Sequence, residues 1–297
     1  MAGPLSGIRI VEMAGLGPGP FCAMMLADHG AEVIRIDRIG NSPDSREVLS
    51  RSRHSIGVDL KKPEGVALVR SLVKSSDGLI EGFRPGVMER LGLGPEMLLA
   101  DNPMLIYGRL TGWGQFGPLA HAAGHDINYI ALAGALHTCG RSDGQPTPPV
   151  NYVGDFAGGG MMLAFGMVSA LLSAKSGGKG QVIDCAMTDG SAVIMGLTWE
   201  FLATGRWVDA PGANLLDSAA HFYDTYPTAD GKWVSVGSIE PQFYALLREK
   251  LGLTADTAFD NQNDPRGWQA LKARLSALFK TKTRVLATPP VDGIRSG

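Results

Sequence analysis

The sequence has few cysteines and almost no excess of either charge. Its 297 residues include three cysteines, Cys22, Cys139 and Cys185, which lie far apart and form no CxxC pair. This spacing excludes a disulfide framework and a zinc site built from thiolates, and it favours a reducing compartment. The formal net charge is −2, so the chain carries no general basic surface of the kind that binds nucleic acid.

Targeting signals are also missing from the sequence. Residues 1–7 lack the charged and apolar regions of a signal peptide, and residues 294–297 are not a peroxisomal address. We therefore expect a cytoplasmic protein, with the peroxisome or mitochondrion as alternatives in a eukaryote. One uncharged run, 156–174, is long enough to span a membrane. Its four glycines, four alanines and two serines dilute its hydropathy, so we interpret it as a helix buried within or between subunits and expect no membrane partner.

Short apolar strands alternate with helices along the first two thirds of the chain. Strands are expected at 8–12, 32–36, 78–81, 105–108 and 181–184, and helices at 21–28, after Pro63 and at 156–174. This alternation predicts a Rossmann-like, doubly wound α/β domain with a parallel sheet over residues 1–204.

The remaining chain shows less periodicity at first. A linker is expected at 205–226, followed by a second, smaller α+β domain at 227–297. That domain would contain a strand at 232–236 and helices at 241–250 and 267–280. From Thr283 onward the sequence predicts no further element.

A GxGxG motif at 15–19 stands between the first strand and the first helix. With Asp37 at the end of the next strand, it has the position of a phosphate-binding turn in a dinucleotide fold. Pro18 and Pro20, however, remove two backbone donors, and Pro20 occupies the place of the third glycine. The motif therefore favours a structural turn, or a loop that shapes another pocket, over a redox dinucleotide site.

Four basic residues follow strand ends: Arg38, Lys61, Arg84 and Arg90. They are either solvated surface charges or a clamp for an anionic ligand that enters at the carboxyl ends of the strands. Arg84 is the most suggestive, because it comes directly after a strand in the segment FRPGV.

His125 and Asp155 are candidates for acid–base chemistry. His125 lies in the polar run GHDINY, and Asp155 precedes a glycine-rich helix that it can cap. At a helix N-terminus the positive end of the dipole would hold the Asp155 carboxyl ionised. A carboxylate beside a near-neutral imidazole makes two groups that can accept or donate a proton. The sequence contains no serine elbow, Walker loop or HExxH motif.

Several segments together resemble one protein family. They are 5–8, 17–21, 27–28, 33–38, 83–87, 111–115, 124–129, 155–160, 178–184 and 239–244. On these segments the chain resembles the α-methylacyl-CoA racemase branch of the class III CoA-transferase (CaiB/BaiF) superfamily. The His-bearing hexapeptide at 124–129 points to the racemase branch rather than to the transferases.

The resemblance implies that the protein interconverts (R)- and (S)-2-methylacyl-CoA thioesters through an enolate. His125 and Asp155 would be the two acid–base groups, Glu240 would support His125, and the Asp126 N–H would lie near the thioester oxygen. Coenzyme A is then part of the substrate, and no metal or redox cofactor is implied. The residues that match the family's coenzyme A and substrate segments are Arg38, Val58, Asp59, Leu60, Lys61, Arg84, Arg90, Gly124, Asp126, Ile127, Asn128 and Tyr129.

Other functions stay open at this point. In a CoA-transferase of the same superfamily Asp155 would be a nucleophile that forms an acyl anhydride and then a CoA thioester. His125 argues against this, because a transferase needs no second proton relay. The family forms interlocked homodimers, and the match dissolves after Lys282, where the usual C-terminal segment would continue. A truncated small domain would leave a protein that binds its ligand without activity. A nicotinamide dehydrogenase is the remote alternative.

Overall fold

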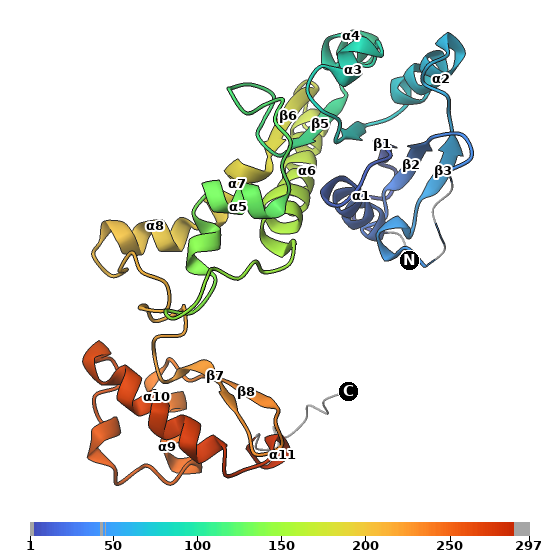
Figure 1. Ribbon diagram of the computed structural model, residues 1–297. Helices are drawn as coiled ribbons and strands as arrows, with labels where there is room; N and C mark the ends of the chain where they lie inside the picture. Colours follow the sequence, from blue (N-terminus) through green and yellow to red (C-terminus); the bar gives the residue numbers. More distant parts are fainter. Residues whose placement is uncertain (1–2, 42–43, 45, 288–297) are drawn as a thin grey trace. The chain divides into compact units, whose positions relative to one another are not determined.

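The computed structural model describes residues 3–41, 44 and 46–287, which form two compact units (Figure 1). The first unit comprises residues 1–136 and 148–199, and the second comprises 137–147 and 200–297. The expected boundary after residue 204 lies close to this division. The expected linker at 205–226 falls inside the second unit, and so does the segment 137–147, which sequence reasoning assigned to the large domain.

The first unit is built on a parallel sheet of six strands in the order β3-β2-β1-β4-β5-β6. The strands are β1 (Arg9–Met13), β2 (Glu32–Asp37), β3 (His54–Gly57), β4 (Gly78–Glu81), β5 (Ile106–Thr111) and β6 (Gln181–Ala186). Strand β1 is central, with Ile10 paired to Val33 of β2 on one side and to Gly78 of β4 on the other. This order is that of a doubly wound sheet, and the predicted fold class is confirmed.

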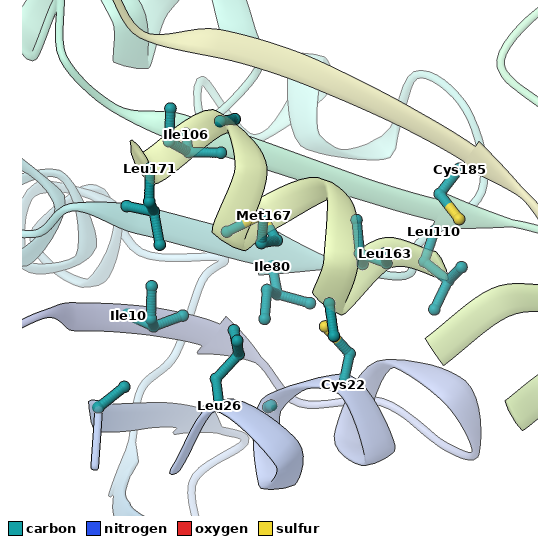
Figure 2. Packing of buried hydrophobic residues seen from close by; sticks show 14 of the residues in the cluster. Ile10, Cys22, Leu26, Ile80, Ile106, Leu110, Leu163, Met167, Leu171 and Cys185 are labelled. Carbon is teal, nitrogen blue, oxygen red and sulfur yellow. The ribbon is translucent and has the colours of Figure 1, made fainter. Parts of the chain in front are cut away.

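Two helices bury one face of this sheet. Cys22 and Leu26 of α1 (Pro18–Asp28) and Met167 of α6 (Met162–Lys175) pack among Ile10, Ile80 and other strand residues (Figure 2). Three helices cover a second cluster around Leu79 and Tyr107. They are α2 (Pro63–Lys74), α3 (Val87–Arg90) and α4 (Pro95–Asp101). The strands are rich in apolar residues because both faces of the sheet are covered, and buried charges on them, such as Glu81 and Arg109, are paired.

The long apolar run forms two consecutive helical types. Residues Tyr152–Met161 (η3) are a π-helix, and α6 continues from Met162. Among the described residues Tyr152–Lys175 is the one helix long and apolar enough to cross a membrane by length and composition, and 44% of its most apolar window is buried within the protein. Its residues Leu163, Met167 and Leu171 belong to the core of the sheet.

The π-helix corrects one expectation about Asp155. Asp155 lies in the first turn of η3 and Asn151 occupies the N-cap position, so the N-cap interpretation is wrong. The glycines that follow it allow close packing with α7 (Met187–Ile194): a Cβ on Gly190 would lie 1.8 Å from the carbonyl oxygen of Gly158. This helix pair holds the Asp155 segment against the rest of the unit.

The remaining elements of the first unit are short. They are η1 (Val48–Ser50), α5 (Asp126–Leu132), η2 (Ala135–Thr138), which runs into the second unit, and α8 (Gly196–Ala203), which leads into it as well.

The second unit has its own aromatic core. Strands β7 (Tyr223–Pro227) and β8 (Trp233–Gly237) form an antiparallel pair. They are accompanied by α9 (Pro241–Lys250), η4 (Thr257–Phe259), α10 (Pro265–Phe279) and α11 (Arg284–Ala287). Phe222, Tyr244, Phe259 and Trp268 are buried at its centre. Helix α11 overturns the prediction that no element follows Thr283, and residues 288–297 lie outside the described part of the chain.

Candidate active site

The candidate site lies where the winding of the sheet reverses, between β1 and β4. A cavity of about 530 Å³ opens there. It is lined by residues 15–20 after β1, by 82–85 after β4, and by His125 and Asp155. In doubly wound sheets ligands bind in this crevice because the loops after neighbouring strands diverge to opposite faces.

His125 immediately precedes α5, and its backbone is fixed by two neighbours. The His125 N–H donates a hydrogen bond to Oδ1 of Asn128 at 3.0 Å. The Tyr129 hydroxyl donates to the Gly124 carbonyl at 2.5 Å, and the Tyr129 ring packs edge-on against Trp113 at 4.8 Å between centroids. The His125 residue itself is exposed and lines the cavity. A hydrogen-bonded backbone thus places the His125 imidazole at the wall of the cavity.

Asp155 reaches the same cavity from η3 and is half-buried. Its Oδ2 accepts a hydrogen bond from Nδ2 of Asn151 at 3.1 Å, and its backbone N–H donates to Oδ2 of Asp126 at 2.7 Å. Burial raises the pKa of the Asp155 carboxyl from its usual value of 3.8, whereas the Asn151 bond and the charge of His125 lower it. Burial is the largest influence on this pKa, and it acts in the direction opposite to the effect expected from the helix dipole.

The glycine-rich loop after β1 makes room for Asp155. Gly17 has a positive φ of 64°, and a Cβ at this position would lie 3.3 Å from Oδ2 of Asp155. Asp37, the residue expected to bind ribose in a dinucleotide site, is 2% exposed. Its Oδ2 accepts a hydrogen bond from the Ser55 hydroxyl at 2.7 Å and lies 3.2 Å from Nε of Arg35. The loop therefore shapes the pocket, and Asp37 is turned inward.

Two of the four predicted basic residues line cavities. Arg84 lines the cavity of His125 and Asp155. Arg38 lines a second cavity of about 640 Å³, which shares residues 15–17 and Pro20 with the first. Lys61 and Arg90 are exposed and stand outside both linings.

An ion network, buried at Glu81 and Arg109, supports the loop that carries Arg84. Oε2 of Glu81 accepts a hydrogen bond from the Phe83 N–H at 2.7 Å, and Oε1 accepts one from Arg109 at 2.9 Å. Arg109 also binds Glu89 of α3 at 2.8 Å. Because Glu81 and Arg109 lie on paired strands, the start of the loop is tied to the sheet.

The other predicted substrate residues differ in their accessibility. Val58 is 5% exposed and belongs to the core. Asp59 and Leu60 are half-buried, and Oδ1 of Asp59 accepts a hydrogen bond from the Lys61 N–H at 3.0 Å. Ile127 is exposed.

Glu240 belongs to the second unit, directly before α9. Its role toward His125 stays a prediction.

Asn151 is the residue of this site that sequence reasoning missed. The only signal was its spacing of four residues from Asp155, which places two side chains on one face of a helical segment. Within the described residues no group of three or more His, Cys, Asp or Glu side chains is arranged to hold a metal ion.

A doubly wound sheet with this site at its switch point defines the class of protein: the chain belongs to CoA-transferase family III, whose profile matches residues 5–288. The chain is 48% identical to α-methylacyl-CoA racemase of Mus musculus over 289 residues, which cover 97% of this chain and 75% of the mouse protein. It is 49% identical to the Homo sapiens racemase with the same coverage. A CaiB/BaiF family protein from Brucella suis shares the fold, with a TM-score of 0.80 and 29% identity over 97% of this chain and 81% of that one.

Proposed function

We propose that the protein is a racemase that interconverts (R)- and (S)-2-methylacyl-CoA thioesters by 1,1-proton transfer. One observation carries the proposal: an imidazole, His125, and a half-buried carboxyl, Asp155, line one cavity at the switch point of the sheet. The relatives named as racemases support the choice of substrate.

The chemistry needs two groups that can each hold a proton. The thioester carbonyl acidifies the α-carbon, because it stabilises the enolate that forms when the proton leaves. His125 takes the α-proton of one enantiomer, and Asp155 returns a proton to the opposite face; the roles are exchanged in the reverse direction. Asp126 is the first residue of α5, and its N–H has no partner within the helix. We assign this N–H to the developing negative charge on the thioester oxygen.

The coenzyme A moiety would lie along the two adjoining cavities. Arg38 and Arg84 line them and carry the positive charge that phosphate groups require. Lys61 and Arg90 are proposed as further contacts at the exposed edge, and Glu240 as a partner that orients His125. The reaction as proposed needs neither a metal nor a redox cofactor.

Deuterium exchange in D₂O tests the proposal. With each pure enantiomer of a 2-methylacyl-CoA, the wild type should incorporate deuterium at the α-carbon and produce the other enantiomer without an added acid. His125→Ala and Asp155→Ala should each lower racemisation by about 100-fold or more, as expected for loss of an acid–base group. Each variant should still exchange the α-proton slowly in the one enantiomer whose base it retains. The enantiomer that exchanges in His125→Ala should therefore be the opposite of the one that exchanges in Asp155→Ala.

Matched controls separate chemistry from folding. His121 is exposed, four residues before His125, and outside the cavity lining, so His121→Ala should keep the wild-type rate. If wild-type protein leaves the α-proton in place but moves CoA to an added carboxylate, the racemase proposal is wrong and Asp155 is a nucleophile.

We also propose a cytoplasmic homodimer. Helix α6 exposes Phe165 and Leu172, at 73% and 68%, along one side, and such an apolar stripe is typical of a surface that another subunit covers. Light scattering at micromolar concentration should give twice the chain mass, and a clean monomer would contradict the proposal. Cell fractionation tests the location.

A further inference from the structure

The carboxylate of Asp126 joins the two elements that carry the proposed acid–base pair. Asp126 is the first residue of α5 and follows His125 directly. Its Oδ2 accepts a hydrogen bond from the backbone N–H of Asp155 at 2.7 Å, although the two residues are 29 positions apart in the sequence. One side chain thus connects the residue after His125 to the backbone of Asp155.

The surroundings of this carboxylate are tightly packed. The Asp126 residue is 6% exposed. A Cβ added to Gly154, the residue before Asp155, would lie 2.6 Å from Oδ2 of Asp126. Because no gap remains between the carboxylate and the η3 backbone, a shift of α5 is transmitted to Asp155.

Packing alone does not account for the negative charge of Asp126. An asparagine oxygen could accept the same hydrogen bond without the cost of burying an ion. The second oxygen, Oδ1, is buried and has no hydrogen-bond partner in the part of the chain that the structure describes. A buried charge with one bond calls for a role beyond satisfying the backbone.

We propose that Asp126 is a positioning residue, whose carboxylate fixes the backbone of Asp155 at a constant separation from His125. This inference rests on the proposed function, since the separation matters only if both groups act on one carbon atom. Proton transfer between fixed groups depends steeply on their geometry, and a misplacement of about 1 Å can lower a rate about 100-fold.

The charge of Asp126 also acts on Asp155. After burial, which is the largest cause, the negative charge of Asp126 raises the pKa of Asp155, and His125 lowers it. The pKa of Tyr129 is raised mainly by burial and, after that, by the charges of Asp155 and Asp126. The loop 15–20 carries no titratable side chain, and the acidic residue of α7, Asp189, is exposed. Removing the charge of Asp126 therefore lowers the pKa of Asp155.

Two substitutions separate the hydrogen bond from the charge. Asp126→Asn keeps an acceptor oxygen for the Asp155 N–H but removes the charge, whereas Asp126→Ala removes both. The matched control is Glu96→Ala, which deletes an exposed acidic residue from the first turn of α4. It reports what the loss of an acidic residue near a helix N-terminus does by itself.

Steady-state kinetics on both enantiomers gives the first measurement. Asp126→Ala should lower kcat about 10-fold or more for both enantiomers while KM changes less than about threefold, because orientation and not binding is lost. Asp126→Asn keeps the acceptor oxygen and should lower kcat less than Asp126→Ala does, because only the charge is lost. For the enantiomer whose proton Asp155 accepts, the acidic limb of the pH–rate profile of Asp126→Asn should lie at lower pH than that of the wild type. A wild-type kcat in Asp126→Ala, or an equal loss in Glu96→Ala, would overturn the proposal.

NMR of the ligand-free protein tests the same contact without activity. In the wild type the Asp155 amide proton should resonate downfield, as a short bond to a carboxylate requires, and it should move upfield in Asp126→Ala. Titration of the ¹³C-labelled Asp155 carboxyl should show a lower pKa in Asp126→Asn. If the wild type exchanges no α-proton, the proposed function is wrong. These spectra would still show whether the Asp155 N–H binds the Asp126 carboxylate. An Asp155 amide that is unchanged in Asp126→Ala refutes the positioning role.

Discussion

The glycine pair between η3 and α7 gives the sharpest test of how the fold positions Asp155. A methyl group on Gly190 would lie 1.8 Å from the Gly158 carbonyl oxygen, whereas real Cβ contacts essentially never fall below 3.0 Å. The two backbones would have to separate by about 1.2 Å, in a packed interior that does not deform freely. Gly158 stands one helical turn after Asp155, so the separation would move the carboxyl.

The cost of Gly190→Ala can be estimated from these contacts. Overpacking of a core costs about 3 kcal/mol when the obstacle is backbone rather than a flexible side chain. Replacing glycine by alanine in a helix returns about 1 kcal/mol. We expect a net loss of about 2 kcal/mol in the free energy of unfolding, and a melting temperature about 5 °C lower. The displacement of Asp155 should lower kcat for racemisation by about 10- to 100-fold.

Urea unfolding and the exchange assay measure both effects. Gly196→Ala is the matched control, because this glycine lies at the start of α8 and its added Cβ would meet nothing within 4 Å. The control should stay within about 0.5 kcal/mol of wild type. If Gly190→Ala is as stable and as active as the control, the argument from the close helix contact is refuted.

Three further predictions follow from single contacts. Asn151→Ala removes a hydrogen bond that lowers the pKa of Asp155, so this pKa should rise. In the direction that uses Asp155 as base, the acidic limb of the pH–rate profile should move to higher pH. An unmoved limb would contradict this prediction. Arg109→Met leaves Glu81 buried without its partner and should cost about 3 kcal/mol in urea unfolding; a loss below about 1 kcal/mol would show the pair to be dispensable. Burial lowers the pKa of His221 from 6.5 to about 4. Below pH 6.5 the unfolded chain therefore binds a proton at this histidine, whereas the folded protein does not until the pH approaches 4. The contribution of the neutral histidine to stability is complete above pH 6.5 and is lost as the pH falls toward 4. His221→Gln should flatten that slope, and an identical slope would count against the assignment.

The sequence was sufficient for the features that depend on local pattern. Alternating apolar strands and helices predicted the doubly wound sheet, because a strand that helices cover on both faces is mostly apolar. The prolines in the loop 15–20 argued against a dinucleotide site, and Asp37 proves to be buried in an ion pair. The segments around His125 and Asp155 were identified from their residues, and the family prediction is confirmed.

The sequence pattern did not predict features that depend on contacts between segments distant in the sequence. Strand β3 was missed, because an edge strand with exposed residues carries no apolar run. Val58, which the family resemblance predicts as a substrate contact, lies in the core because the crossover after β3 determines which way it faces. Its role toward the substrate stays a prediction.

For the acid–base pair, the sequence by itself determined the two chemical groups, and the tertiary structure decided how they are held. The residue types at 125 and 155 set what protons can be exchanged. The π-helix that carries Asp155, its packing on α7 through paired glycines, and the hydrogen bond from its N–H to Asp126 are contacts between distant segments. Such contacts form only when the chain has closed long loops, so no local pattern encodes them.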